Sequence, residues 1–194
     1  MKMKKLLIAL PLVYMLSSCV SIGNSEAPSS FLVLTASNSV SADQITTADA
    51  KNTIVVSVPD TPRKLATNRI PVQINDSSIA YIQNAFWADK PAKLMQQLIS
   101  ETLSANGHFV AENAQNSSKA KQIISGSLDE FGVVENGPYA IVRFDAVKSN
   151  GGSVIEKRRF EARQDISLID ANEAGAALNQ AANQVAAQIA DWVK

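Results

Sequence analysis

One long amphipathic helix near the C-terminal end most restricts what this chain can fold into. Asp170 and Glu173 are spaced as in a capping box at a helix start. The apolar face comprises Ala174, Leu178, Ala181, Ala182, Val185, Ile189, Trp192 and Val193, and the polar face comprises Gln180, Gln184, Gln188 and Asp191. A helix on a membrane surface would carry lysine and arginine on its polar face. We therefore expect this helix to pack on a sheet, with its alanines allowing a close approach.

A second helix is expected in the middle of the chain, from about Pro91 to Asn106. Proline suits the first turn of a helix, and Asn106-Gly107 provides a left-handed stop. One mainly apolar stripe lies between these ends and consists of Leu94, Met95, Leu98, Ile99, Thr102 and Leu103. This spacing also predicts a helix that buries one side.

Short β-forming segments surround the two helices. Strands are expected at residues 31–34, 53–59, 69–75, 79–87, 108–112, 122–134, 139–147 and 154–166. Residues 79–87 could instead form an irregular arm, and Pro71 indicates an edge position or a bulge. Asn150-Gly151 is a strong hairpin signal. Because helices and strands are segregated, we expect one α+β domain over residues 31–194, with two amphipathic helices packed on one face of a mostly antiparallel sheet.

The N-terminal residues have the three-part layout of a secretory signal. Three lysines within the first five residues precede an apolar block at residues 6–16, which is followed by the small residues Ser17 and Ser18. A transmembrane helix needs about 20 apolar residues, and this block is shorter and contains Pro11. We expect residues 1–18 to be a signal peptide.

The end of this signal is specific, because Leu16-Ser17-Ser18-Cys19 resembles the bacterial lipobox. The resemblance implies cleavage before Cys19, diacylglycerol on its thiol and an acyl chain on its new amino group. A disulfide within the chain is excluded because Cys19 is the only cysteine. The alternative interpretation makes Cys19 an ordinary small residue of the signal. Residues 19–30 are expected to form a lipidated, flexible tether, and residues 35–52 a second polar loop.

Charge and motifs exclude several classes of function. The chain has 18 Lys+Arg and 18 Asp+Glu, and removal of residues 1–18 takes three lysines, so the mature form is about three charges negative. Nucleic acid is therefore not an expected partner. The single histidine, His108, has no acid–base partner nearby in sequence, and the chain lacks zinc-ligand pairs, phosphate-binding glycine loops and nucleophile elbows. We expect a protein that is not an enzyme and holds no metal or cofactor.

Residues 60–105 contain an aromatic run that leads into the first helix. Its characteristic positions are Tyr81, Phe86, Trp87, Ala88, Asp89 and Pro91. With the strands at 31–34 and 54–59, the chain resembles the ABC-type transport auxiliary lipoprotein family, which includes the lipoprotein of the paraquat-inducible Mce system. It departs from the family pattern at Lys90, inserted before Pro91, and at residues 60–70, where an Asp-Arg-Pro phrase matches only loosely.

The resemblance implies a role in transport. Family lipoproteins work beside an ABC permease, its ATPase and a periplasmic Mce-domain protein, which carry lipids or other hydrophobic compounds across the Gram-negative envelope. Lipoproteins that are retained in the inner membrane usually have an aspartate directly after the lipidated cysteine, and this chain has Val20 at that position. The implied location is therefore the periplasmic face of the outer membrane, with a lipid anchor. The expected role is docking. A homo-oligomer is compatible with this role.

Five residues are candidates for contact with the partner. Tyr81, Phe86 and Trp87 belong to a residue type enriched at interface anchors, and Arg63 and Arg69 fall in a predicted exposed loop and strand. The alternative packs Phe86 and Trp87 beneath the first helix and leaves the arginines as solvated surface. Two other roles share the anchor: a periplasmic carrier with a lipid-binding cavity, and an outer-membrane assembly or secretion lipoprotein unrelated to Mce systems.

Replacement of Cys19 by serine tests the anchor. We expect the C19S protein to leave the membrane fraction, because firm retention needs two or more acyl chains. Fractionation measures the release, and mass spectrometry of the wild-type N-terminal peptide measures the acyl addition. A C19S protein that still sediments with membranes, combined with an unmodified wild-type peptide, would contradict the assignment.

Overall fold

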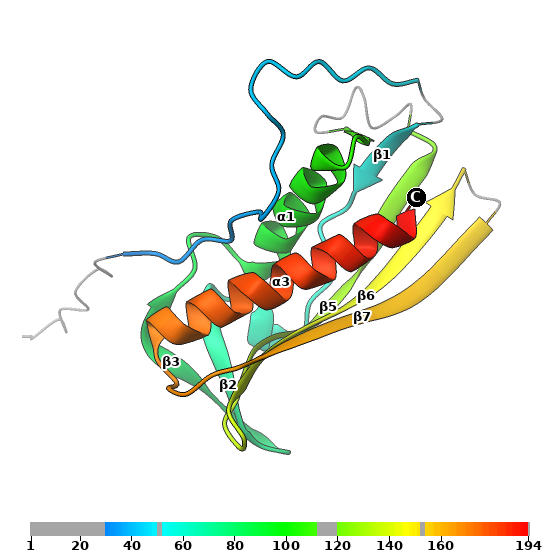
Figure 1. Cartoon of the computed structure of the whole chain (residues 1–194). Coiled ribbons are helices and arrows are strands. Elements are labelled where there is room, and N and C mark those ends of the chain that lie inside the picture. Colours follow the sequence, from blue (N-terminus) through cyan, green and yellow to red (C-terminus); the bar gives the residue numbers. More distant parts are fainter. Residues whose placement is uncertain (1–29, 50–51, 112–119, 152–153, 194) are drawn as a thin grey trace, which may run out of the picture.

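Two helices cover one face of a sheet in the computed structural model, which describes residues 30–49, 52–111, 120–151 and 154–193. The helices are α1 (Pro91–Ala105) and α3 (Ala171–Val193), and Figure 1 shows both in front of the same sheet face. The strands are β1 (Thr53–Val56), β2 (Arg69–Asn75), β3 (Ser78–Phe86), β4 (Phe109–Val110), β5 (Gln122–Val134), β6 (Tyr139–Asn150) and β7 (Val154–Asp165). A 3-10 turn, η1 (Arg63–Leu65), lies between β1 and β2. The predicted signal peptide and Cys19 lie outside the described residues.

β5 is the strand around which the described sheet is organised. Along one edge it pairs with β6, which pairs with β7, and both pairings are antiparallel. Along its other edge β5 pairs with β1 near its start and with β2 near its end, both in parallel. β3 extends β2 in antiparallel orientation, and β4 extends β1 in parallel.

The expected α+β class is confirmed, but the expected mostly antiparallel sheet is wrong, because the sheet is mixed. The physical reason is the crossover connections that parallel neighbours require. α1 lies between β3 and β4 in the chain and returns β4 parallel to β1. Residues 57–68 carry the chain onward from β1 without reversing it, so β2 also runs parallel to β5.

Pro71 marks a bulge in β2. The expectation of a bulge is confirmed by the register shift between Arg69 and Pro71, whereas the edge alternative is wrong because β2 lies between β3 and β5. The neighbouring strand makes room for the proline with a glycine. A Cβ at Gly132 would lie 2.5 Å from the Pro71 carbonyl oxygen, a distance that only the absence of a side chain allows.

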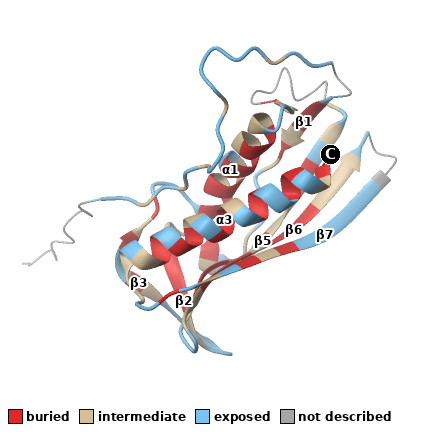
Figure 2. Ribbon diagram, viewed as in Figure 1, coloured by how far each residue is buried: buried red, intermediate tan, exposed pale blue. Residues whose placement is uncertain are grey.

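The buried face of α3 lies against β6 and β7. Its buried residues include Leu178, Val185, Ile189 and a series of alanines. Figure 2 shows buried and exposed positions alternating along α3. The aromatic side chains of Trp87, Phe131, Phe144 and Phe160 fill the core and are at most 2% exposed. In the described residues, no helix is long and apolar enough to cross a bilayer.

The start of α3 uses the predicted capping residues in a modified way. Asp170 accepts a hydrogen bond from the Glu173 backbone N–H at 2.8 Å, as the capping box requires. The Glu173 carboxylate, however, accepts from the N–H groups of Ser167 and Leu168 rather than from Asp170. The cap therefore ties α3 to the chain that leaves β7.

Residues 31–40, which we call the N-terminal strap, lie along the helices (Figure 1). The strand expected at residues 31–34 is reduced to one bridge between Leu32 and Trp87. Leu32, Leu34 and Ala36 pack against the core, while the alternate residues Phe31 and Val33 are exposed. The strap therefore has the alternation of a strand although it lies over a helix.

Polar side chains of both helices bind the backbone of the strap. Thr35 N–H donates to Asn179 Oδ1 at 2.8 Å, and Ser37 N–H donates to Asn183 Oδ1 at 2.7 Å. Asn183 Nδ2 donates to the Thr35 carbonyl at 2.9 Å. Val40 N–H donates to Glu101 of α1 at 3.1 Å. The two asparagines thus pair with the strap much as a neighbouring strand would.

Replacement of Asn183 by alanine is expected to loosen the strap. The change removes the acceptor of Ser37 N–H and the donor to Thr35, at a cost of about 1 kcal/mol. Hydrogen exchange of the Ser37 amide should speed up about fivefold, while amides of β6 stay protected. Q188A, at an exposed α3 position, is the matched control. Unchanged exchange at Ser37 in N183A would contradict this role.

Candidate partner-binding surface

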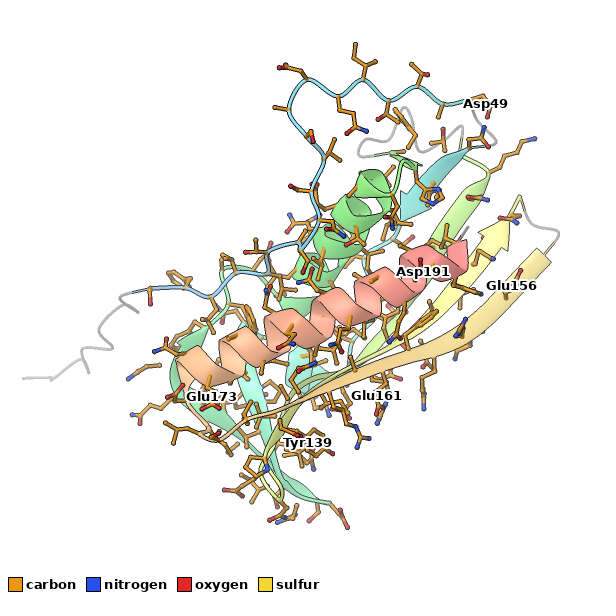
Figure 3. All side chains as sticks on the ribbon, viewed as in Figure 1. Asp49, Tyr139, Glu156, Glu161, Glu173 and Asp191 are labelled. Atoms are coloured by element: carbon orange, nitrogen blue, oxygen red, sulfur yellow. The ribbon has the colours of Figure 1, made fainter. Side chains whose placement is uncertain are left out.

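The face of β5, β6 and β7 that points away from α3, here called the outer face, is strongly polar. Side chains alternate along each strand, so the helix-facing residues Val142, Phe144 and Phe160 are buried while their neighbours point outward. Figure 3 shows Tyr139 and Glu161 on the side of the sheet away from α3. No helix of the described chain covers this face (Figure 1).

Asp145 is the centre of one ion-pair cluster on the outer face. Arg159 donates to both of its carboxylate oxygens, from Nε at 2.6 Å and from Nη2 at 2.9 Å. Lys157 Nζ lies 3.2 Å from Asp145 Oδ2, and Arg159 also reaches Asp129 at 3.4 Å. The Asp145 side chain is only 9% exposed, so the carboxylate at the centre of the cluster is nearly buried.

Glu161, two residues beyond Arg159 on β7, is the centre of a second cluster. Arg143 Nε donates to it at 2.6 Å, and Arg163 binds its other oxygen at 2.8 Å. The Arg163 guanidinium lies 5.0 Å from the centre of the Tyr139 ring. This arrangement extends the polar network across β6 and β7 to the end of the sheet near β2.

The two clusters keep their carboxylates ionised. Hydrogen bonds from Arg159 hold the pKa of Asp145 below its ordinary value, with Lys157 adding to the effect and burial opposing it. Burial acts to raise the pKa of Glu161, but Arg143 and Arg163 together outweigh it, so this pKa is also lowered. These cations and anions are therefore paired at neutral pH.

A pocket of about 390 Å³ opens where η1, β2, β5 and β6 meet. Its apolar part includes Pro71, Gly132, Val133 and Ile141, and its polar part includes Lys64, Gln73, Asp76, Glu130, Tyr139 and Arg143. The ion pair between Lys64 and Glu130 also borders a second pocket of about 370 Å³. Pockets of this size lie in the range that ligands use, and their charged margins favour a polar occupant.

Four of the five predicted contact residues lie on η1, β2 and β3, and none of them lines this pocket. Tyr81 Oη donates to the Lys64 carbonyl at 3.2 Å, and the Arg69 guanidinium lies 4.7 Å from the Tyr81 ring centre. Phe86 is opposite Arg69 in the β2–β3 register, and Arg63 is exposed on η1. The structure therefore brings together residues that are up to 23 positions apart in the sequence.

Trp87, the fifth residue, is fully buried. Its ring packs edge-on against Phe131 at 5.3 Å between centres, in agreement with the alternative in which it packs in the core. His108 follows the end of α1, where its N–H donates to the Leu103 carbonyl. Across the described ranges, no cluster of three or more His, Cys, Asp or Glu residues could hold a metal ion.

The sequence reasoning missed the charged residues of β6 and β7. One signal was present, because Arg143 and Asp145 alternate with apolar residues, and so do Arg159 and Glu161. That parity predicts a polar face. Which cation meets which anion depends on the β6–β7 register, which places Arg143 opposite Glu161 and Asp145 opposite Arg159.

The Asp145 cluster predicts a specific dependence of stability on pH. The folded-state pKa of Asp145 lies below that of the unfolded chain, about 3.9, so its carboxylate stabilises the fold above that pH. This contribution is lost as the pH falls through the folded-state value. Urea unfolding at about pH 6 and about pH 2.5 should show a smaller loss for D145N than for wild type.

A D129N variant is the matched control, since Asp129 contacts Arg159 at a longer distance, 3.4 Å. Its loss of stability on acidification should remain close to that of wild type. If D145N instead loses as much stability as wild type, Asp145 does not contribute in this way.

The comparisons with known proteins agree with this fold. The model of the family described as ABC-type transport auxiliary lipoprotein component matches residues 33–190. None of the curated proteins matches the chain. Protein XCC0632 from Xanthomonas campestris, of family DUF330, has a similar crystal structure, with a TM-score of 0.70 and 17% identity over 84% of this chain and 94% of that chain.

Two further solved structures are similar. One is a crystal structure of an uncharacterized protein, with a TM-score of 0.65 and 18% identity over 77% of this chain and 97% of that chain. The other is the hypothetical protein CT253 from Chlamydia trachomatis, with a TM-score of 0.50 and 9% identity over 74% and 98%. At these identities the likeness shows a common fold. The family match covers most of the sequence, and the chain therefore belongs to the ABC-type transport auxiliary lipoprotein components.

Proposed function

We propose that this lipoprotein is the docking component of an Mce-type ABC transport system that moves lipids or other hydrophobic compounds across the envelope. Its partners are a periplasmic Mce-domain protein and the ABC permease with its ATPase. Cys19 carries the acyl chains that hold it at the periplasmic face of the outer membrane. The domain catalyses no reaction and needs no cofactor beyond these chains.

The observation that carries the proposal is the difference between the two sides of the domain. Asn179 and Asn183 hold the N-terminal strap against the helices, so chain leading from the anchor already occupies that side. The outer face has a prearranged set of charges and an adjoining pocket. A surface of fixed, paired charges favours recognition of one specific partner.

The way the core is filled favours docking over the carrier alternative. A carrier needs an apolar cavity of ligand size. In this domain Trp87, Phe131, Phe144 and Phe160 fill the space between the helices and the sheet, and the alanines of α3 bring the helix close. The pocket beside η1 is instead lined by charged groups such as Lys64 and Glu130.

Site-specific photocrosslinking in cells tests the proposal. A benzoylphenylalanine at Tyr139, on the outer face, should capture the Mce-domain protein or a transporter subunit, identified by mass spectrometry. The same probe at Gln188, an exposed position on α3, is the matched control and should not capture them. Capture of transport subunits from Gln188 alone would reverse the proposed faces. Capture of only unrelated envelope proteins from Tyr139 would favour an assembly or secretion role.

A further inference from the structure

Arg69 of β2 differs from the three arginines of the outer face because no carboxylate of the described chain pairs with it. Arg143, Arg159 and Arg163 each pair with a carboxylate. Arg69 has no such partner within the described residues, and its guanidinium lies over the face of the Tyr81 ring, 4.7 Å from the ring centre.

The Arg69 side chain also has a donor without an acceptor. Its Nε is buried and makes no hydrogen bond to any described residue. Buried donors in folded proteins nearly always have a partner, and leaving one unpaired costs more when the group is charged. An external acceptor cannot reach this covered atom. The terminal Nη groups of Arg69 are not among the buried atoms, and they too have no acceptor in the described chain, so they are free to bind an external acceptor.

The contacts around Arg69 hold it in place. The Tyr81 ring against which it stacks is fixed by the hydrogen bond from its hydroxyl to the Lys64 carbonyl. Phe86 lies opposite Arg69 on β3. A planar guanidinium that is already positioned loses less conformational freedom when it forms a two-point contact.

We propose that Arg69 binds a carboxylate, from an aspartate or glutamate side chain of the docking partner. This inference rests on the proposed docking function and specifies the chemistry of its contact. The carboxylate accepts hydrogen bonds from the two terminal Nη groups of the guanidinium, and the exposed Arg63 on η1 adds positive charge at the margin. Glu130 and Glu161 do not compete for Arg69, because Lys64 and Arg143 already pair with them.

Arginine side-chain NMR on the full-length protein in detergent micelles tests the site directly. The chain has six arginines, so few Nε signals need assignment. Titration with an acetylated and amidated Ala-Asp-Ala peptide should shift the Arg69 Nε signal to saturation. The Ala-Asn-Ala peptide, which has the same shape without the charge, should not.

Arg158 provides the matched control, because it also stacks on an aromatic ring, that of Phe160 at 5.0 Å, without a carboxylate partner in the described chain. R69K keeps the charge but loses the planar fork, and it should weaken peptide binding about tenfold. R158K should change binding by less than about twofold. Equal shifts with both peptides, or equal shifts at Arg69 and Arg158, would overturn the proposal.

This experiment separates the carboxylate site from the docking function. Peptide binding at Arg69, combined with no capture of transport subunits from Tyr139, would retain the site and reject the proposed partner. Capture from Tyr139 that persists at the wild-type level in R69K, with no peptide binding at Arg69, would retain the docking function and reject the site.

Discussion

The close contact of α3 with β6 and β7 is the interaction on which the rest of the structure depends. Alanines along one side of α3 let the helix approach the sheet, and the buried side chains of Phe144 and Phe160 help to fill the core of the domain. Because strand residues alternate between faces, fixing this side also fixes which residues of β6 and β7 point outward. The charged outer face is thus a consequence of the same packing that forms the core.

The N-terminal strap distinguishes the two sides of the domain, because it covers the helix side and leaves the outer face open. Leu32 packs where Gly175 leaves room, since a Cβ at Gly175 would lie 2.9 Å from a Leu32 methyl carbon. Asn179 and Asn183 then hold the following backbone. Chain that leads from the predicted lipid anchor therefore reaches the domain on its helix side. A partner that approaches the outer face would not have to displace it.

Local patterns predicted the helices and most strands, whereas long-range pairing decided the rest. The stripe from Leu94 to Leu103 and the face from Ala174 to Val193 correctly gave α1 and α3. The parallel pairing of β1 and β2 with β5 was missed, because strand direction depends on how residues 57–68 cross the sheet. The contact of Arg69 with Tyr81 was likewise beyond local patterns, although both residues had been singled out.

Hydrogen exchange of the lipoprotein alone and in complex with the proposed Mce-domain partner tests the central claim most directly. The account predicts slower exchange in η1 and in the strands of the outer face, with α1, α3 and the strap unchanged. Slower exchange confined to α3 and the strap would contradict it, because the partner would then bind the side that leads to the predicted lipid anchor.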